Sequence, residues 1–356
     1  MCGIVGIVSK SNCLDQVING LYSLEYRGYD SSGVAFLNDD KFFAKRCVGK
    51  ISSLEKILSK ENLNSKIVIG HTRWATHGKP ELKNCHPFLK NNCALVHNGI
   101  IENFEQLINF YSLDTNKILS ETDSEIIAEI FNKLLKKYNN PIDSIRDLIK
   151  KINGTFSLGF LVKNSNSIFA TRKGSPLVLG LSDTFNCISS DLLGLPEETK
   201  GIIFLEENDI ATISQSSISI YDIEGNKVKR KIHDFIQKKD FKIRGNYKHF
   251  MEKEIFHQPI SIEDTILNFA DKKTQIVYLP QTNINFSNFS NLILVACGTA
   301  YHSCMIAKYW IETLTDFNVS IDIASEYRYK KNLIHKKSIG IVVSQSGETM
   351  DTLQCL

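Results

Sequence analysis

The sequence lacks several features that would set it apart from an ordinary globular protein. No stretch approaches the ~18 consecutive apolar residues that a membrane span needs. The apolar run at the start has no cationic segment before it and ends at Lys10, so we expect no signal peptide. The net charge is only +3, and no basic stripe or acidic tail is present. We therefore expect neither nucleic acid nor a membrane as a partner.

A disulfide framework and a metal-binding pattern are also missing. The nine cysteines are odd in number and irregularly spaced, which predicts reduced thiols and a cytoplasmic protein. One region is dense in possible metal ligands: His71, His77, Cys85, His86, Cys93 and His97. None of them forms a CxxC or HxxxH pair, so we expect no metal and no cofactor.

The pattern of apolar residues predicts an α+β first domain. Residues 2–8, CGIVGIV, indicate a buried strand, and residues 14–25 have apolar positions at helical spacing. TFSLGFLV and SIFATRKG predict an antiparallel pair, and GIIFLEENDIATIS with SSISIYDIEGNKV predicts a meander. Short strands interrupted by two or three helices favour stacked antiparallel sheets.

The pattern changes after a polar, poorly periodic stretch at residues 236–246. Beyond it, strand, glycine- or serine-containing loop and helix follow one another twice, which predicts a doubly wound parallel sheet. We therefore expect a first domain at 2–236, a linker at 237–250 and a second domain at 251–356.

The first candidate site centres on Cys2. If Met1 is removed, the thiol and a free α-amine belong to one residue, which can then be both nucleophile and base. Asn98 and Gly99 follow a predicted strand and could donate hydrogen bonds to an oxyanion. Arg73 could hold a carboxylate, and Asp123 could pair with an ammonium group.

Each of these residues also has a simpler explanation when taken alone. Cys2 could be a small buried residue, and Asn98-Gly99 could be an ordinary turn. Asp123 could cap a helix, and Arg73 could form a surface ion pair.

Five motifs in order resemble the class II glutamine amidotransferases: CGIVG, EYRGYDSSG, HTRWATHG, HNGIIEN and SETDSE. The resemblance covers about residues 2–235 and implies an N-terminal-nucleophile hydrolase fold, a four-layer αββα sandwich. It implies that Cys2 attacks the side-chain amide of L-glutamine, with Asn98 and Gly99 as the oxyanion hole. The other residues it assigns to the site are Arg27 near the nucleophile, Arg73 and Asp123 on the glutamine carboxylate and amine, Thr76, His77 and Gly78 in the loop over glutamine, and Trp74 on the ammonia path.

Two loops in the second half indicate a phosphate site. They carry Gly298 and Thr299 in the first loop, and Ser344, Gln345, Ser346 and Thr349 in the second. Hydroxyls and backbone N–H groups at helix starts bind anions, although the second loop could be only a capped helix start.

KHFMEKEIFHQP, CGTAYHS, SEYRYKK and SQSGETMDTL resemble the sugar-isomerase domain of family members that use D-fructose 6-phosphate. This implies formation of D-glucosamine 6-phosphate and L-glutamate, and a homodimer when the isomerase domain is complete. Ala300 stands where the family usually has serine. The family continues well beyond residue 356, so we expect a truncated isomerase domain and glutaminase turnover without appreciable amino sugar.

The alternatives are a stand-alone glutaminase or another class II amidotransferase, acting on phosphoribosyl pyrophosphate or aspartate. A degenerate sugar-phosphate-binding module without activity, in which Met1 is retained, is a further one. Two sugar-phosphate loops after such a linker favour the enzyme that acts on fructose 6-phosphate.

Overall fold

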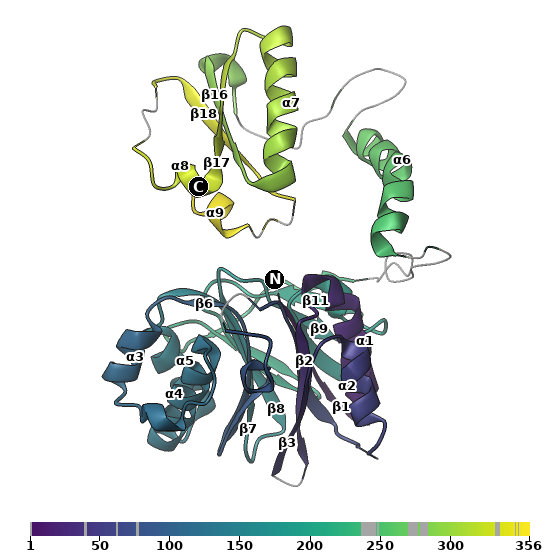
Figure 1. The fold of residues 1–356 in the computed structure, drawn as a ribbon, viewed down its shortest axis with the longest axis vertical. Helices are drawn as coiled ribbons and strands as arrows, with labels where there is room; N and C mark the ends of the chain where they lie inside the picture. Colours follow the sequence, from purple (N-terminus) through teal and green to yellow (C-terminus); the bar gives the residue numbers. More distant parts are fainter. Residues whose placement is uncertain are drawn as a thin grey trace. The chain divides into compact units, whose positions relative to one another are not determined.

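The computed structural model describes residues 2–38, 41–61, 63–75, 78–235, 247, 249–269, 277, 284–331, 335–345, 347 and 349–356. Its contacts divide the chain into two compact units, Met1–Lys242 and Ile243–Leu356, which are described separately (Figure 1). The division falls within the predicted linker, 237–250. Of that linker only residues 247, 249 and 250 belong to the described part.

Two antiparallel sheets form the first unit. The first sheet has the strand order β15-β11-β9-β10-β1-β4-β2-β3. Its strands are β1 Gly3–Ser9, β2 Ser31–Asn38, β3 Lys41–Val48, β4 Ile67–Arg73, β9 Val178–Leu181, β10 Phe185–Ser189, β11 Gly201–Phe204 and β15 His233–Asp234.

The second sheet has the order β14-β13-β12-β8-β7-β6-β5. Its strands are β5 Phe88–Lys90, β6 Cys93–Ile101, β7 Gly154–Val162, β8 Ser167–Lys173, β12 Ile210–Ser214, β13 Ile218–Tyr221 and β14 Lys227–Val228. The predicted pairing of TFSLGFLV with SIFATRKG is confirmed by the antiparallel register of β7 and β8.

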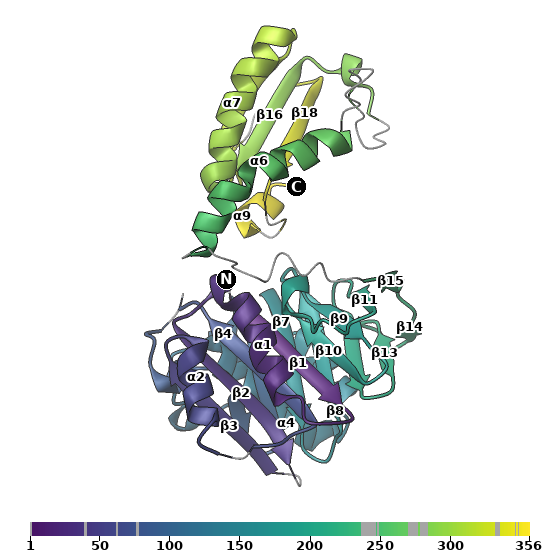
Figure 2. The same ribbon diagram turned by 90° about the vertical axis from the view of Figure 1, so that its right-hand side faces the viewer.

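Helices cover the outer face of each sheet. α1 Leu14–Leu24 and α2 Ile51–Leu58 lie on the first sheet, and α1 runs over β1 and β4 (Figure 2). On the second sheet lie α4 Asp123–Tyr138 and α5 Pro141–Ile149, with α3 Phe104–Phe110 beside them (Figure 1). Short 3-10 helices are η1 Glu25–Arg27, η2 Leu82–Asn84, η3 Thr115–Lys117 and η4 Leu192–Gly194.

The strand β1 is buried on both faces, which explains its unbroken apolar sequence. Ile4 and Val8 point into the layer between the two sheets. Val5 and Ile7 point the other way, into the layer beneath α1 and α2. This alternation follows the two-residue period of a strand. The four-layer αββα sandwich is therefore confirmed.

Local sequence sets the boundary between α4 and α5. Asn139 ends α4 in the left-handed conformation, with φ of 49°. The Asn140 side chain then accepts the N–H groups of Ile142 and Asp143, and Pro141 takes the first position of α5. Asparagine and proline are favoured at these positions because they satisfy or remove unpaired N–H groups.

The predicted meander is wrong in part. β12, β13 and β14 do form consecutive antiparallel strands of the second sheet. β11, however, pairs with β9 and β15 in the first sheet. The chain crosses from one sheet to the other between Phe204 and Ile210, and strand periodicity does not indicate which sheet a strand joins.

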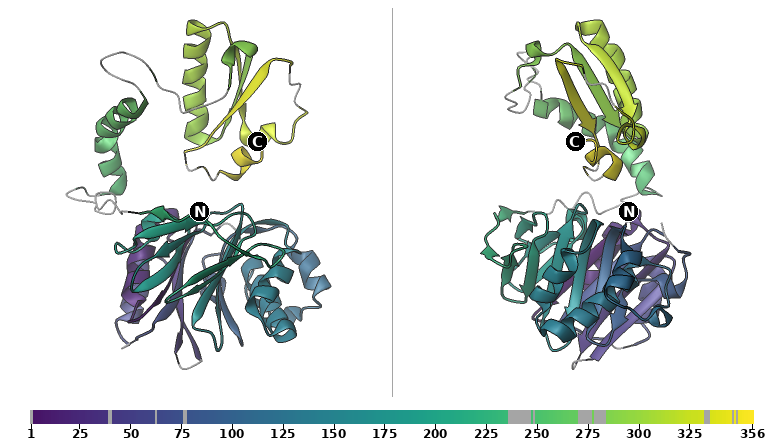
Figure 3. Two further views of the ribbon diagram at one scale, coloured as in Figure 1. Left: turned by 180° about the vertical axis from the view of Figure 1, so that it is seen from behind. Right: turned by 90° about the vertical axis from the view of Figure 1, so that its left-hand side faces the viewer.

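The second unit contains a parallel sheet of order β17-β16-β18, as predicted. Its elements are α6 Phe250–Phe269, η6 Phe286–Asn288, β16 Asn291–Ala296, α7 Gly298–Leu314, β17 Asn318–Ile323, α8 Ala324–Tyr327, β18 Ser338–Val343 and α9 Met350–Leu353. α7 packs against all three strands (Figures 1 and 3). The buried members of its hydrophobic cluster are Leu292, Leu294, Ala296, Cys304 and Val319.

The composition of the hydrophobic clusters predicts that the first unit folds alone. All three of its clusters consist of residues no later than Phe235. A chain ending at Lys242 should therefore unfold cooperatively, with a Tm within ~5 °C of the corresponding transition in the full chain. Calorimetry of both chains checks this, and a short chain without a cooperative transition would contradict it.

Candidate active site

The candidate nucleophile, Cys2, lies directly before β1, where the neighbouring strand β4 ends in Arg73. The thiol is half-buried, and the Trp74 N–H donates to Cys2 Sγ over 3.3 Å. Burial raises the pKa of the thiol, while the Trp74 hydrogen bond and the charges of Arg73 and Arg27 oppose this to a smaller extent. The thiol is therefore protonated near neutral pH and needs a base to become a nucleophile.

β6 brings Asn98 and Gly99 from the second sheet to Cys2. Asn98 Nδ2 donates to the Cys2 carbonyl oxygen over 3.1 Å, and Asn98 Oδ1 lies 3.0 Å from His71 Nε2. Gly99 has φ of 126°, and a Cβ there would lie 2.0 Å from the Thr155 carbonyl oxygen. Only glycine fits this position. The pair places a side-chain amide donor at Cys2, where an oxyanion hole would need one.

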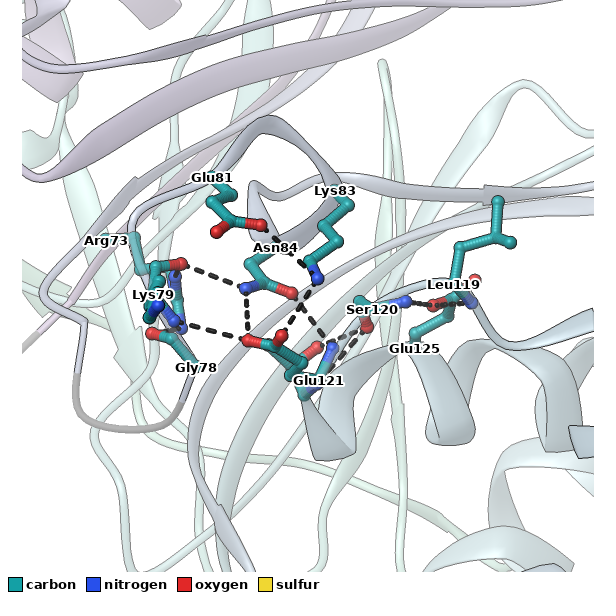
Figure 4. Close-up of polar contacts among 11 residues, drawn as sticks. Arg73, Gly78, Lys79, Glu81, Lys83, Asn84, Leu119, Ser120, Glu121 and Glu125 are labelled. Carbon is teal, nitrogen blue, oxygen red and sulfur yellow. Dashed lines mark hydrogen bonds and ion pairs between the residues drawn. The ribbon is translucent and has the colours of Figure 1, made fainter.

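Arg73 is buried at the end of β4 and points toward the loop that follows. Its guanidinium donates to the carbonyl oxygens of Gly78 and Lys79, each over 3.4 Å (Figure 4). The guanidinium is thus held by two backbone carbonyl oxygens of this loop. Such a group can bind a carboxylate through two parallel hydrogen bonds.

Asn84 and Glu121 fasten this loop to the segment before α4. The buried Asn84 donates from Nδ2 to Lys79 O over 2.9 Å and to Glu121 Oε2 over 3.1 Å, and its Oδ1 accepts the Glu121 N–H over 2.9 Å. Lys83 adds an exposed ion pair to Glu121, at 2.8 Å (Figure 4). Hydrogen bonds therefore connect the carbonyl groups that receive Arg73 to a residue two positions before Asp123.

Asp123 is the first residue of α4, and its carboxylate reaches back to the second sheet. Oδ2 accepts the Ile101 N–H over 2.8 Å, and Oδ1 accepts the Ser124 hydroxyl over 3.1 Å. The side chain is 17% exposed. These bonds tie Asp123 to the strand that carries Gly99, and the exposed part of the carboxylate can still receive a cation.

The turn EYRGYD, residues 25–30, packs against the backbone of Trp74, which contacts the thiol. Arg27 is buried and donates to Ser190 O over 3.1 Å and to Asp191 Oδ2 over 3.0 Å. A Cβ on Gly28 would lie 2.6 Å from Trp74 N, so the turn packs directly on the backbone beside the thiol. Trp74 itself is 43% exposed and so lies at the surface beside the thiol.

The structure places Asn98 in hydrogen-bond contact with Cys2 and Arg73 at the end of the strand next to Cys2, and it joins Asp123 to Ile101, two residues after Gly99. Gly78 lies at Arg73, and Trp74 lies at the thiol. Thr76 and His77 lie outside the described residues. The roles of all these residues in binding glutamine stay predictions.

Four residues of the site were not identified from the sequence as parts of it. Asp30 Oδ2 accepts the Ala75 N–H over 2.8 Å and so positions the chain after Trp74. His71 contacts Asn98, and Asn84 and Glu121 hold the loop after Arg73. Of these four residues, only His71 could have been assigned to the site from its position in the sequence. It precedes Arg73 by two positions on β4 and therefore points to the same side of the sheet.

In the second unit, the two predicted phosphate loops leave adjacent strands at one edge of the sheet. Ala296 of β16 is paired with Val343 of β18, so both loops begin side by side. Gly298 and Thr299 start α7 and are exposed. In the other loop, Ser344 Oγ accepts the Gly347 N–H over 3.1 Å and lies 3.1 Å from Thr349 Oγ1.

These contacts show that part of the second loop is already ordered around its own hydroxyl groups. Gln345 is exposed, and Ser346 lies outside the described residues. Ala300 packs against the hydrophobic cluster under α7, so no hydroxyl is available there. Phosphate binding by these residues stays a prediction.

Among the described residues, no helix is long and apolar enough to cross a membrane. The same residues contain no group of three His, Cys, Asp or Glu side chains that could together hold a metal ion.

Comparison with known families gives two matches. Residues 1–182 match the family described as "Glutamine amidotransferases class-II", and residues 285–356 match the SIS domain. Relatives named "Glutamine--fructose-6-phosphate aminotransferase (isomerizing)" are 40% identical over 357 residues in Brucella suis biovar 1 and 40% identical over 362 residues in Haemophilus influenzae. In both, the alignment covers 100% of this chain and 59% of the relative, so the chain spans about three fifths of their length.

A solved structure supports the fold alone. The glutamine phosphoribosylpyrophosphate amidotransferase from B. subtilis aligns with a TM-score of 0.53 and 20% identity. The alignment covers 64% of this chain and 50% of that one.

Three buried histidines behind Cys2 predict a steep loss of stability in mild acid. Burial lowers the pKa of His71 to about 3, holds that of His86 well below its usual range and lowers that of His97. Below the usual pKa of ~6.5, these histidines become protonated in the unfolded chain but stay neutral in the folded protein. The free energy of unfolding should therefore fall between pH 7 and pH 5, by roughly 1 kcal/mol per pH unit for His71, and the lowered pKa values of His86 and His97 should add to this fall.

Urea denaturation of the first unit at pH 7, 6 and 5 measures this slope. His86→Phe keeps a ring against His71 but removes one such group, so the stability of this variant should fall less steeply with decreasing pH. Equal stability at pH 7 and pH 5 would contradict the burial of neutral imidazoles.

Proposed function

Because this chain belongs to the class II glutamine amidotransferases, we propose that its first unit hydrolyses L-glutamine at Cys2 and that the ammonia serves to convert D-fructose 6-phosphate into D-glucosamine 6-phosphate. The observation that carries the proposal is the convergence of Cys2 with Asn98 and Gly99 from two different sheets, next to the buried cation Arg73.

The proposed hydrolysis proceeds through a thioester. The Cys2 sulfur forms a bond to the amide carbon of glutamine, and the carbonyl electron pair moves onto oxygen, which Asn98 Nδ2 and the Gly99 N–H stabilise. The C–N bond then breaks, and ammonia leaves with the proton taken from the thiol. Water next cleaves the thioester to glutamate and restores the thiol. The raised pKa of the thiol makes a base necessary for the first step.

We propose the α-amine of Cys2, freed by removal of Met1, as that base. Its ordinary pKa of about 7.7–8.0 suits proton transfer near neutral pH. Arg73 would hold the glutamine carboxylate and Asp123 its ammonium group, with Thr76, His77 and Gly78 in the loop over it. Trp74 would line the ammonia path, and Arg27 would support the nucleophile.

The second unit supports the choice of acceptor. The SIS match and the 40% identity of relatives named for fructose 6-phosphate point to a phosphorylated ketose. We propose that Gly298, Thr299, Ser344, Gln345, Ser346 and Thr349 bind its phosphate. We assign no residue of this chain to opening the sugar ring.

We also propose a reducing, cytoplasmic setting, because all nine cysteines are free thiols. The expectation of a homodimer rests on the resemblance to isomerase domains, and sedimentation of the purified chain tests it.

An assay of both products tests the proposed function. The chain, with intact mass showing whether Met1 is removed, is incubated with glutamine, with and without fructose 6-phosphate. Glutamate should form, and Cys2→Ala should abolish it while the far-UV spectrum stays unchanged. Wild-type turnover in a chain that retains Met1 would contradict the proposed base, and undiminished turnover in Cys2→Ala would contradict the nucleophile. Glucosamine 6-phosphate is measured separately, and its formation tests whether fructose 6-phosphate is the acceptor.

The Asn84–Glu121 contact predicts an effect on glutamine binding. Asn84→Ala removes three hydrogen bonds, two donated by Nδ2 and one accepted by Oδ1, each worth ~1 kcal/mol, and loosens the carbonyl groups that orient Arg73. The KM for glutamine should rise about 10-fold to 50-fold with kcat changed less than about 3-fold.

The matched control is Lys83→Met, which removes the exposed ion pairs to Glu121 and Glu81 but none of the Asn84 hydrogen bonds, and it should change KM less than about 2-fold. Equal effects of the two substitutions would show that the buried hydrogen bonds do not set the position of Arg73.

A further inference from the structure

The orientation of the Asn98 amide decides whether this residue can act in the proposed hydrolysis. A side-chain amide has two orientations of nearly equal shape, and only one presents NH₂ to a developing oxyanion. In the structure, Nδ2 faces Cys2 and Oδ1 faces away, toward His71. The reversed amide would place two oxygen atoms, Asn98 Oδ1 and Cys2 O, against each other.

The contacts of His71 Nε2 fix which of its nitrogens carries hydrogen. This atom lies 3.0 Å from the His97 carbonyl oxygen and 3.0 Å from Asn98 Oδ1. A carbonyl oxygen can only accept, so Nε2 carries the hydrogen and donates to both oxygens. Burial keeps the ring neutral, so this tautomer persists across the physiological pH range.

The rest of the His71 ring makes no comparable polar contact. Within the described part of the chain, Nδ1 is buried without a hydrogen-bond partner. The ring instead stacks on His86, with centroids 4.1 Å apart. Leaving a buried nitrogen unpaired destabilises a fold, so an apolar side chain would suit this place better if packing were its only role. The polar role that remains for His71 is donation to Asn98 and to the adjacent backbone.

We propose that His71 is a positioning residue, which holds the Asn98 amide with its NH₂ group toward the carbonyl oxygen of the substrate during attack by Cys2. This inference rests on the proposed glutamine hydrolysis. His71 itself transfers no proton and does not touch the reacting atoms. Its effect reaches the reaction only through Asn98.

The test compares His71→Gln with His71→Met. The two side chains have similar length and flexibility, but only glutamine carries an N–H donor. Two rates are measured: glutamine hydrolysis, which develops an oxyanion, and alkylation of Cys2 by iodoacetamide, which develops none at this site. His71→Met should lower kcat about 10-fold to 100-fold with KM changed less than about 3-fold, and His71→Gln should recover most of kcat.

Alkylation should stay within about 2-fold of wild type in both variants, because the thiol itself is unchanged. His86→Phe, which alters the stacking partner but not the hydrogen bond, is the control and should keep kcat. Equal losses in the methionine and glutamine variants, or a parallel loss of alkylation, would overturn the proposal and leave His71 with a packing role. If His71→Met does not fold, His71→Asn, whose amide is too short to reach Asn98 Oδ1, replaces it.

A double-mutant cycle separates positioning from packing. On an Asn98→Ala background, His71→Met should cause no further loss of kcat, because the group it orients is absent. A further loss of the same size as in wild type would overturn the proposal. Absence of glutamate formation by the wild-type chain would instead count against the proposed function, so the two failures are distinguishable.

Discussion

The layer of apolar side chains between the two sheets determines whether a site exists at all. Cys2 directly precedes β1 of the first sheet, whereas Asn98 and Gly99 belong to β6 of the second. The 3.1 Å hydrogen bond between Asn98 and Cys2 joins residues that are 96 positions apart in the chain. It therefore depends on how the two sheets pack together. A one-residue slip of β1 against β4 would turn Cys2 to the opposite face. Ile4 and Val8, buried in that layer, oppose such a slip.

Along its length, the strand β4 contributes first to the apolar core and then to the site. On β4, Ile69, His71 and Arg73 follow one another at two-residue spacing and face the second sheet. Ile69 packs in the apolar layer, His71 hydrogen-bonds to Asn98, and Arg73 reaches the loop beyond. The site therefore lies where the apolar layer gives way to polar groups. Burial there raises the pKa of the Cys2 thiol and lowers that of His71.

The sequence was most informative where residues adjacent in the chain act together. Asn98-Gly99 and the start of α4 could be assigned to the site from the sequence. Their positions follow from the strand and helix patterns around them, and the order of the motifs connects them with Cys2. Asn84 and Asp30 could not be found in this way, because each holds backbone groups and no side-chain pattern marks such contacts. The sheet that β11 joins was missed for a related reason: its apolar pattern suits either sheet.

The two proposed contacts to glutamine differ in how they are supported. Asp123 is bonded to the Ile101 N–H, two residues after Gly99, so this carboxylate and the oxyanion corner move as one body with β6. Arg73 instead depends on carbonyl groups of a loop that Asn84 connects to Glu121. Under the proposed binding mode, the contact at Asp123 therefore depends on β6 itself, whereas the contact at Arg73 depends on the hydrogen bonds of the loop. If glutamine binds as proposed, its ammonium group would set its position relative to Cys2, and the carboxylate contact would set the affinity.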